Sequence, residues 1–337
     1  MSSASRDAYL SSGSSPTLSL VGAGKVGRAF LGLADLGRYR LRSASDRSGT
    51  ICDADRLDPR AVAARKLRDG RLRTDGDKVD LDLALSLVEA DAVVDTTDSD
   101  LDEADEAVAR SLAVLDRGQV LVAACKAALW AAGDELLAPG RRERYGIDAV
   151  LGGTGRALAR ELDELRAGTA AIVAVPNATT TCLIEVLERG GTHAEGLALA
   201  RERGLLEADP TQDVDGRDAA LKLATVARLV LRADVDWRDV ERPDLFAIEP
   251  GLLADRAARG RTTRLVARCD PDGPRLAYEE LPRNASLAIP SRHVLYAYDD
   301  AQGRRRLHLG LGVGPEATAR ALLGDLDALL GAGEGDR

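Results

Sequence analysis

Residues 17–27 read TLSLVGAGKVG, and this stretch decides the fold of the first part of the chain. It opens with a short apolar strand and continues into the pattern G-x-G-x-x-G at Gly22, Gly24 and Gly27. The spacing predicts a helix over 28–37 and a second strand over 39–45 that leads to Asp46. A strand, a glycine turn, a helix and a second strand with a terminal acid form the fingerprint of a dinucleotide-binding Rossmann unit.

The fingerprint assigns contacts to the cofactor. The glycines let the backbone approach a pyrophosphate, and the start of the helix adds partial positive charge. These contacts are expected from Gly22, Gly24, Lys25, Val26 and Gly27. Asp46 is expected to meet the adenosine ribose, whereas Arg47 and Lys66 favour the 2′-phosphate of NADP. We therefore expect NADP, with NAD as the alternative cofactor and solvated charges as the alternative interpretation of the two basic residues.

Polar side chains follow two further predicted strands of this sheet. Thr96 and Thr97 close a strand at 91–97, at the edge where a parallel sheet presents ligands. Lys126 ends a strand predicted over 119–126, and the apolar run before it indicates more than a surface position. A lysine placed there is a candidate proton donor.

The composition limits the class of protein. The 337 residues suffice for two domains, and an aromatic content of 3% means that the core rests on Ala, Val and Leu. A net charge of −9 argues against a nucleic acid or an anionic membrane as partner, and no apolar run reaches spanning length. The four scattered cysteines favour reduced thiols in a cytoplasmic protein.

A second stretch, residues 207–222, reads EADPTQDVDGRDAALK. Five acids within twelve residues precede a helix whose start is marked by Gly216. Asp218 and Lys222 are four residues apart and share one helix face. A carboxylate beside an ammonium, with Glu207 in the preceding loop, can orient a small zwitterion and move a proton. Taken alone, such a pair is more often a surface salt bridge.

This second stretch resembles the signature of the homoserine dehydrogenase family, roughly G-x-x-E-x-D-P-x-x-D-x-x-G-x-D-x-x-x-K. Every fixed position is met, by Gly204, Glu207, Asp209, Pro210, Asp213, Gly216, Asp218 and Lys222. The resemblance extends over about residues 18–330. It implies reversible hydride transfer between L-homoserine and L-aspartate 4-semialdehyde with NAD(P)H, in threonine, methionine and isoleucine biosynthesis.

The resemblance also implies roles for single residues. The catalytic residues would be Lys126, Lys222, Asp218 and Glu207. The substrate contacts would be Asn177, Thr179, Thr180, Glu207, Asp213, Asp218 and Lys222, with a helix N-cap as the alternative interpretation of the first three. The cofactor contacts would include Thr96, Thr97, Lys126, Gly312 and Gly314. A sodium ion could bind at Asp148, Leu151 and Gly153, in a segment whose glycines also suit a hinge.

The chain departs from the family pattern at several of these positions. Asp98 stands where the family has a proline, and Cys125 and Thr181 stand where it has asparagines. Two alternatives therefore stay open. One is a divergent relative that acts on another amino-acid alcohol or aldehyde, and the other is a non-catalytic NAD(P)-binding protein.

The expected fold class is α/β, with a Rossmann dinucleotide-binding domain and an α+β substrate and dimerisation domain that contains an open sheet. The expected divisions are a disordered tail at 1–16, the cofactor domain at 17–147 and 308–331, and the substrate domain at 148–307. We expect a cytoplasmic homodimer with a small amino-acid substrate. We also expect no ACT regulatory domain, because the sequence stops at Arg337.

Overall fold

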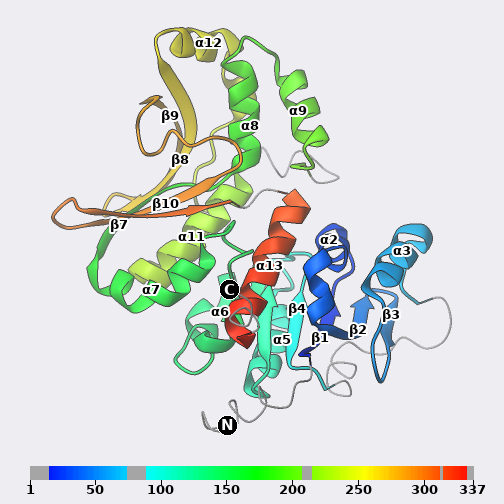
Figure 1. Ribbon diagram of the computed structural model, residues 1–337. Helices are drawn as coiled ribbons and strands as arrows, with labels where there is room; N and C mark the ends of the chain where they lie inside the picture. The colour runs from blue at the N-terminus through cyan, green and yellow to red at the C-terminus, as the bar shows by residue number, and fades with distance from the viewer. Residues whose placement is uncertain (1–14, 74–88, 207–214, 312–313, 332–337) are drawn as a thin grey trace. The chain divides into compact units, whose positions relative to one another are not determined.

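The computed structural model describes residues 15–73, 89–206, 215–311 and 314–331 (Figure 1). The chain divides into two compact units, one of residues 1–150 with 319–337 and one of residues 151–318. The elements of the first unit are β1 (Thr17–Val21), α2 (Lys25–Leu31), η1 (Ala34–Arg38), β2 (Arg40–Asp46), β3 (Gly49–Cys52), α3 (Pro59–Asp69), β4 (Ala92–Asp95), α5 (Ala104–Asp116), β5 (Val120–Ala123), α6 (Ala127–Leu136), η2 (Arg142–Arg144) and β6 (Tyr145–Gly146).

The second unit begins with a helix and continues as a mixture of helices and long strands. Its elements are α7 (Gly155–Gly168), β7 (Thr169–Val175), α8 (Ala178–Leu187), α9 (His193–Glu202), α11 (Arg217–Leu231), η3 (Leu245–Ala247), α12 (Pro250–Ala258), β8 (Arg261–Asp270), β9 (Gly273–Pro282), β10 (Val294–Asp300) and β11 (Arg305–Gly310). The last helix, α13 (Gly314–Leu330), begins in the second unit and ends in the first.

The sheet of the first unit has the strand order β3-β2-β1-β4-β5-β6. All neighbours pair in parallel except β3, which forms an antiparallel hairpin with β2. The central strand β1 is buried along its whole length, because its five residues are covered on both faces. The carboxyl ends of β2, β1, β4 and β5 therefore lie along one edge of the sheet, where doubly wound folds bind their ligands.

The core of the first unit is built around β1 and two helices. Leu18 and Leu20 of β1 and Phe30 of α2 share one cluster with Leu322 and Leu326 of α13. Each of these side chains is completely buried. The hydrophobic stripe of α13 thus packs on the sheet of the first unit through residues that lie some 300 positions after β1.

The second unit contains an antiparallel sheet with the order β11-β10-β7-β8-β9. Helix α11 packs against β7, β8 and α7. Val173, Val175, Val266, Leu295 and Ala297 belong to one buried cluster contributed by three of the strands. Figure 1 shows the β8–β9 and β10–β11 hairpins that end in the two edge strands.

The structure corrects three element predictions. The helix predicted over 28–37 ends at Leu31, where Gly32 caps it, and resumes as a 3-10 turn. The strand predicted to end at Lys126 stops at Ala123, so Lys126 caps α6 instead. The run CLIEVLERGG predicts a helix over 182–191, but α8 already begins at Ala178, because Asn177 caps it there. The sequence also predicts a helix over 81–88, and these residues lie outside the described ranges.

Candidate functional site

The three glycines of the turn after β1 differ in whether packing requires them. Gly22 has a φ of +89°, and a Cβ there would lie 2.6 Å from the backbone of Thr96. A Cβ on Gly27 would lie 2.1 Å from the carbonyl oxygen of Gly22. Gly24, in contrast, has an ordinary φ of −71°, and a Cβ there would meet nothing within 4 Å. Packing does not require a glycine at position 24. The open space beside Gly24 fits the close approach of a dinucleotide pyrophosphate.

Asp46 ends β2 as predicted, but its carboxylate faces the protein. The side chain is 5% exposed, and Oδ2 accepts a hydrogen bond from Lys66 Nζ at 2.6 Å and another from the Leu72 amide at 3.1 Å. Oδ1 accepts hydrogen bonds from the amide and hydroxyl of Ser48. Burial raises the pKa of Asp46, but the bonds from Lys66 and Ser48 outweigh it and hold the pKa below its ordinary value.

These bonds change the expected roles around the ribose. Both oxygens of Asp46 are occupied by protein donors, and Lys66 also donates to the carbonyl of Gly70 at 2.8 Å. Asp46 and Lys66 are thus bound to each other at 2.6 Å. Arg47 differs, because its side chain is 92% exposed and pairs with Asp98, which is 85% exposed.

The turn after β4 is fixed by a buried ion pair. Asp95, 4% exposed, accepts two bonds of 3.2 Å from Arg110, and its other oxygen accepts bonds from the amide and hydroxyl of Thr97. Thr96 donates its hydroxyl to the carbonyls of Val21 and Gly22. The hydroxyls of Thr96 and Thr97 therefore shape the turn. Sequence reasoning missed Arg110, which lies on the following helix without a motif to mark it.

Lys126 is held at the same edge of the sheet. Its amide donates to Ser99 Oγ at 2.8 Å, which joins the turn after β4 to the start of α6. Cys125, next to it, is buried and donates its thiol to the carbonyl of Asp98. The turn after β4 thus contacts both residues that precede α6.

In the second unit, Asp218 and Lys222 form part of a partly buried network. Lys222 Nζ donates to Asp218 Oδ2 at 2.7 Å and to the carbonyl of Pro176 at 3.1 Å. Asn177 Nδ2 donates to the same carboxylate oxygen at 3.3 Å. The side chains of Lys222 and Asp218 are 13% and 25% exposed. The pair therefore joins α11 to the start of α8, and it is not an isolated surface salt bridge.

The polar residues at the start of α8 act mainly as a cap. Asn177 Oδ1 accepts the amide of Thr180 at 2.8 Å, and Thr179 donates its hydroxyl to the carbonyl of Leu205. Thr180 is completely buried, and its hydroxyl has no hydrogen-bond partner in the described part of the chain. The N-cap interpretation accounts for these bonds. Asn177 also reaches the Asp218–Lys222 pair.

Several predicted site residues are not tested by these contacts. Glu207, Asp213 and Gly312 lie outside the described residues, while Gly314 begins α13 with a φ of +81°. The amide of Asp148 donates to Asp325, and the carbonyl of Leu151 accepts the hydroxyl of Thr154. Within the described ranges, no three His, Cys, Asp or Glu side chains are grouped to hold a metal ion. Sodium binding stays a prediction.

Tyr296 is a residue near this network that the sequence does not mark. It lies on β10, is completely buried, and its hydroxyl has no hydrogen-bond partner in the described part of the chain. Burial above all, together with Tyr298 and the charge of Asp218, raises the pKa of Tyr296 well above its ordinary value. In the sequence, Tyr296 reads only as an alternating strand residue.

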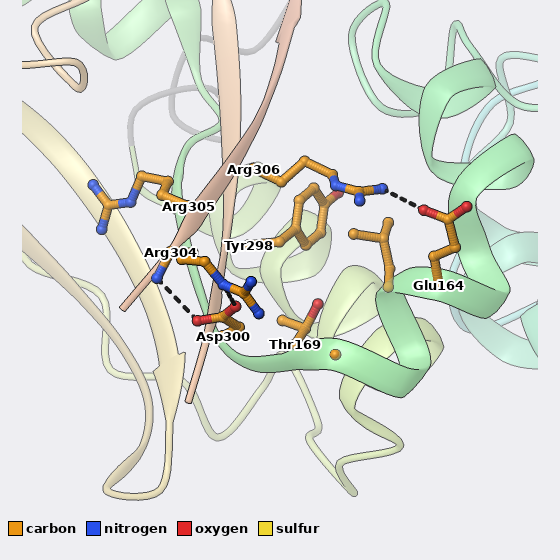
Figure 2. Close-up of a pocket in the computed structure, with 9 residues that line it drawn as sticks. Glu164, Thr169, Tyr298, Asp300, Arg304, Arg305 and Arg306 are labelled. Atoms are coloured by element: carbon orange, nitrogen blue, oxygen red, sulfur yellow. Dashed lines mark hydrogen bonds and ion pairs between the residues drawn. The ribbon is translucent and has the colours of Figure 1, made fainter. Parts of the chain in front are cut away.

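A hollow of about 390 Å³ in the second unit lies apart from these residues (Figure 2). Its arginines are matched by acids, with Arg304 paired to Asp300 and Arg306 to Glu164. Its lining residues are Glu164, Leu165, Gly168, Thr169, Tyr298, Asp300, Arg304, Arg305 and Arg306. None of the predicted site residues that the structure describes is among them, so the hollow is not the candidate site.

Comparison with known proteins decides the family. A profile described as homoserine dehydrogenase matches residues 160–326. The homoserine dehydrogenase of Methanocaldococcus jannaschii is 27% identical over 300 residues, which cover 86% of this chain and 88% of that protein. The homoserine dehydrogenase of Mycobacterium bovis is 28% identical over 326 residues, which cover 89% of this chain and 71% of that protein. This chain belongs to the homoserine dehydrogenase family. It is accordingly an oxidoreductase that acts on a CH–OH group.

The fold agrees with this assignment. A hyperthermophilic archaeal homoserine dehydrogenase, solved in complex with NADPH, superposes with a TM-score of 0.71 at 23% identity. The match covers 94% of this chain and 98% of that one. The predicted fold class, a Rossmann sheet with a separate antiparallel sheet, is therefore confirmed. No helix within the described ranges is long and apolar enough to cross a membrane.

Proposed function

We propose that this member of the homoserine dehydrogenase family interconverts L-homoserine and L-aspartate 4-semialdehyde, with NADP favoured over NAD. The observation that carries the proposal is the Asp218–Lys222 pair, held at 2.7 Å and anchored by Asn177 and Pro176. A carboxylate and an ammonium in one fixed geometry suit a substrate that carries both a hydroxyl or carbonyl group and an amino-acid backbone.

The first unit is the proposed cofactor domain. The turn at Gly22, Gly24 and Gly27 would hold the pyrophosphate, because only Gly24 opens onto free space. Arg47 would receive the 2′-phosphate, since its guanidinium is exposed at the end of β2. When bound, the nicotinamide supplies or accepts the hydride.

The proton is proposed to move through a lysine. Lys222 Nζ would polarise the aldehyde oxygen and protonate it as the alcohol forms, while Asp218 keeps the ammonium in place. Lys126 is the alternative donor, and the bond from its amide to Ser99 fixes its backbone. Glu207 would hold the substrate ammonium. We further propose a homodimer located in the cytoplasm, where its four free cysteines stay reduced.

A divergent substrate is the second candidate. Cys125 replaces the family asparagine directly before Lys126, and its buried thiol offers a weaker and shorter donor than an amide side chain. A different hydrogen-bond donor next to Lys126 would suit a different amino-acid aldehyde.

Oxidation of NADPH and NADH, followed spectrophotometrically with L-aspartate 4-semialdehyde, tests the proposal. Turnover with this aldehyde, faster than with other amino-acid aldehydes, is the expected result. Turnover confined to other aldehydes would favour the divergent substrate. Cofactor binding without turnover of any aldehyde would overturn both candidates.

A further inference from the structure

We propose that the ion pair between Arg47 and Asp98 is a built-in competitor for the 2′-phosphate of NADP, and that it sets the preference between NADP and NAD. The inference rests on the proposed function, because it concerns the cofactor domain of that enzyme. Arg47 Nη2 lies 2.9 Å from Asp98 Oδ2, and the two side chains are 92% and 85% exposed. The pair is thus open to exchange with a ligand.

The pair stands across the glycine turn. The amide of Gly22 donates to the carbonyl of Ser45 at 2.9 Å, which fixes the end of β2 against the turn. A Cβ on Gly22 would lie 2.6 Å from the backbone of Thr96, so the end of β4 abuts the turn from the other side. Arg47 and Asp98 each follow two residues after these contacts. Their ion pair therefore joins the two loops that flank the turn.

In this chain, the carboxylate that usually decides cofactor choice is bonded to protein donors. An acid at the end of the second strand normally accepts the ribose hydroxyl and disfavours a 2′-phosphate. Here that acid, Asp46, is 5% exposed and bonded to Lys66 and to the Leu72 amide. The exposed carboxylate beside Arg47 is instead that of Asp98. Asp98, and not Asp46, is thus the carboxylate that affects the choice between NADP and NAD.

The strengths of the two contacts make the exchange possible. An ion pair between side chains this exposed is weak, because solvent screens it and two long side chains lose freedom. A guanidinium binds a phosphate through two charge-assisted hydrogen bonds, which are stronger. NADP therefore displaces Asp98 from Arg47, while NAD leaves the pair intact. The free energy needed to break the Arg47–Asp98 pair therefore lowers the net affinity for NADP.

Dissociation constants of NADPH and NADH, measured by titration calorimetry on the full-length protein, test this competition. Asp98→Asn and Asp98→Ala should each bind NADPH about two- to fivefold more tightly than the wild type, and NADH within about twofold of it. Arg47→Ala should weaken NADPH by about tenfold or more and spare NADH. With Arg47→Ala already present, Asp98→Asn should lose most of its effect on NADPH.

Asp105→Asn serves as the matched control, since it removes the same charge from the exposed first turn of α5. It should leave both dissociation constants unchanged. An equal gain from Asp105→Asn, or a full gain from Asp98→Asn without Arg47, would overturn the competition. Weaker NADPH binding by Asp98→Asn would also overturn it, because Asp98 would then orient Arg47 for the phosphate. A wild-type protein that binds NADH but not NADPH would instead overturn the proposed cofactor.

Discussion

Lys222 is the residue on which the proposed chemistry depends most directly. It is held by Asp218 at 2.7 Å and by the carbonyl of Pro176 at 3.1 Å, with 13% of its side chain exposed. We predict that Lys222→Ala lowers kcat by at least about a hundredfold, because general acid–base groups contribute about 10²–10⁴-fold in rate. The affinity for NADPH should stay near that of the wild type. Steady-state kinetics combined with cofactor titration measure both quantities.

An exposed pair provides the control for this prediction. Arg304 and Asp300 are also four residues apart and ion-paired, but the arginine side chain is 80% exposed. Arg304→Ala should leave kcat unchanged, as expected of a solvated salt bridge. If Lys222→Ala also kept a near-normal kcat on its true substrate, Lys222 would have no part in the chemical step.

At the residue scale, the sequence predicts those contacts that follow from local spacing. Asp218 and Lys222 are neighbours because four residues make about one helical turn. The orientation of Asp46 could not be predicted, because it depends on Lys66 and Leu72, some 20 and 26 residues away. The burial of Tyr296 near Asp218 depends likewise on how β10 pairs with β7 in the folded sheet.

The glycine turn at the start of α2 gives a prediction in which two similar substitutions differ. Gly27→Ala places a methyl group 2.1 Å from the carbonyl oxygen of Gly22, so the turn or the helix must shift. Gly24→Ala meets no protein atom within 4 Å and has an allowed φ of −71°. We expect Gly27→Ala to lower the thermal midpoint by several degrees. Gly24→Ala should keep the midpoint and weaken NADPH binding about tenfold or more.

Thermal unfolding without cofactor and NADPH titration separate the two effects. Equal losses of stability would mean that Gly24 serves packing after all. Unchanged NADPH binding by Gly24→Ala would mean that the cofactor does not approach this position closely.

Helix α7 and strand β11 are joined by a carboxylate whose titration affects stability. Glu161 accepts bonds from Arg306 at 2.8 Å and from His308 at 3.1 Å, and from Arg160 on its own helix. Burial raises the pKa of Glu161, but these bonds outweigh it and lower the pKa to about 2. Because the folded pKa lies below the unfolded one, the stabilisation is complete above pH 4.5 and is lost as the pH falls towards 2.

We predict that Glu161→Gln lowers the free energy of unfolding by about 1 kcal/mol at pH 7, since three charge-assisted bonds are replaced by weaker ones. The difference from the wild type should shrink steadily as the pH falls from 4.5 towards 2. Urea unfolding at several pH values measures it. A difference that stays constant with pH would show that the charge of Glu161 is not the source of the stabilisation.

At the element scale, apolar runs predict most strands but not their ends or their partners. The β-branched and apolar run TAAIVAV predicts a strand over 169–175, and β7 has the same bounds, because the run lies between a helix and a capping asparagine. The end of β5 was misplaced, because Ala124 and Cys125 are as apolar as the strand and carry no turn signal. The short antiparallel strand β3 was missed, since four residues show no clear alternation.

At the scale of the whole molecule, the edge strand β11 supports the proposed assembly. Leu307 and Leu309 alternate along β11, Leu311 follows directly after it, and the three side chains are 45%, 58% and 62% exposed. A row of exposed leucines on an unpaired strand edge is a template for pairing with another chain. A two-fold axis beside the strand would bring the same row of each copy together, as an isologous dimer interface requires.

The last prediction concerns this interface. Leu309→Glu should convert the homodimer into a monomer, because one carboxylate per copy would be buried near the axis without a partner. Leu67 of α3 is 74% exposed, so Leu67→Glu is the matched control and should leave the mass unchanged. Light scattering at micromolar concentration should give twice the chain mass of 35.6 kDa for the wild type and the control, and 35.6 kDa for Leu309→Glu. A wild-type mass of one chain would refute the dimer. A dimeric Leu309→Glu variant would refute only the role of β11, because the copies would then associate through another surface.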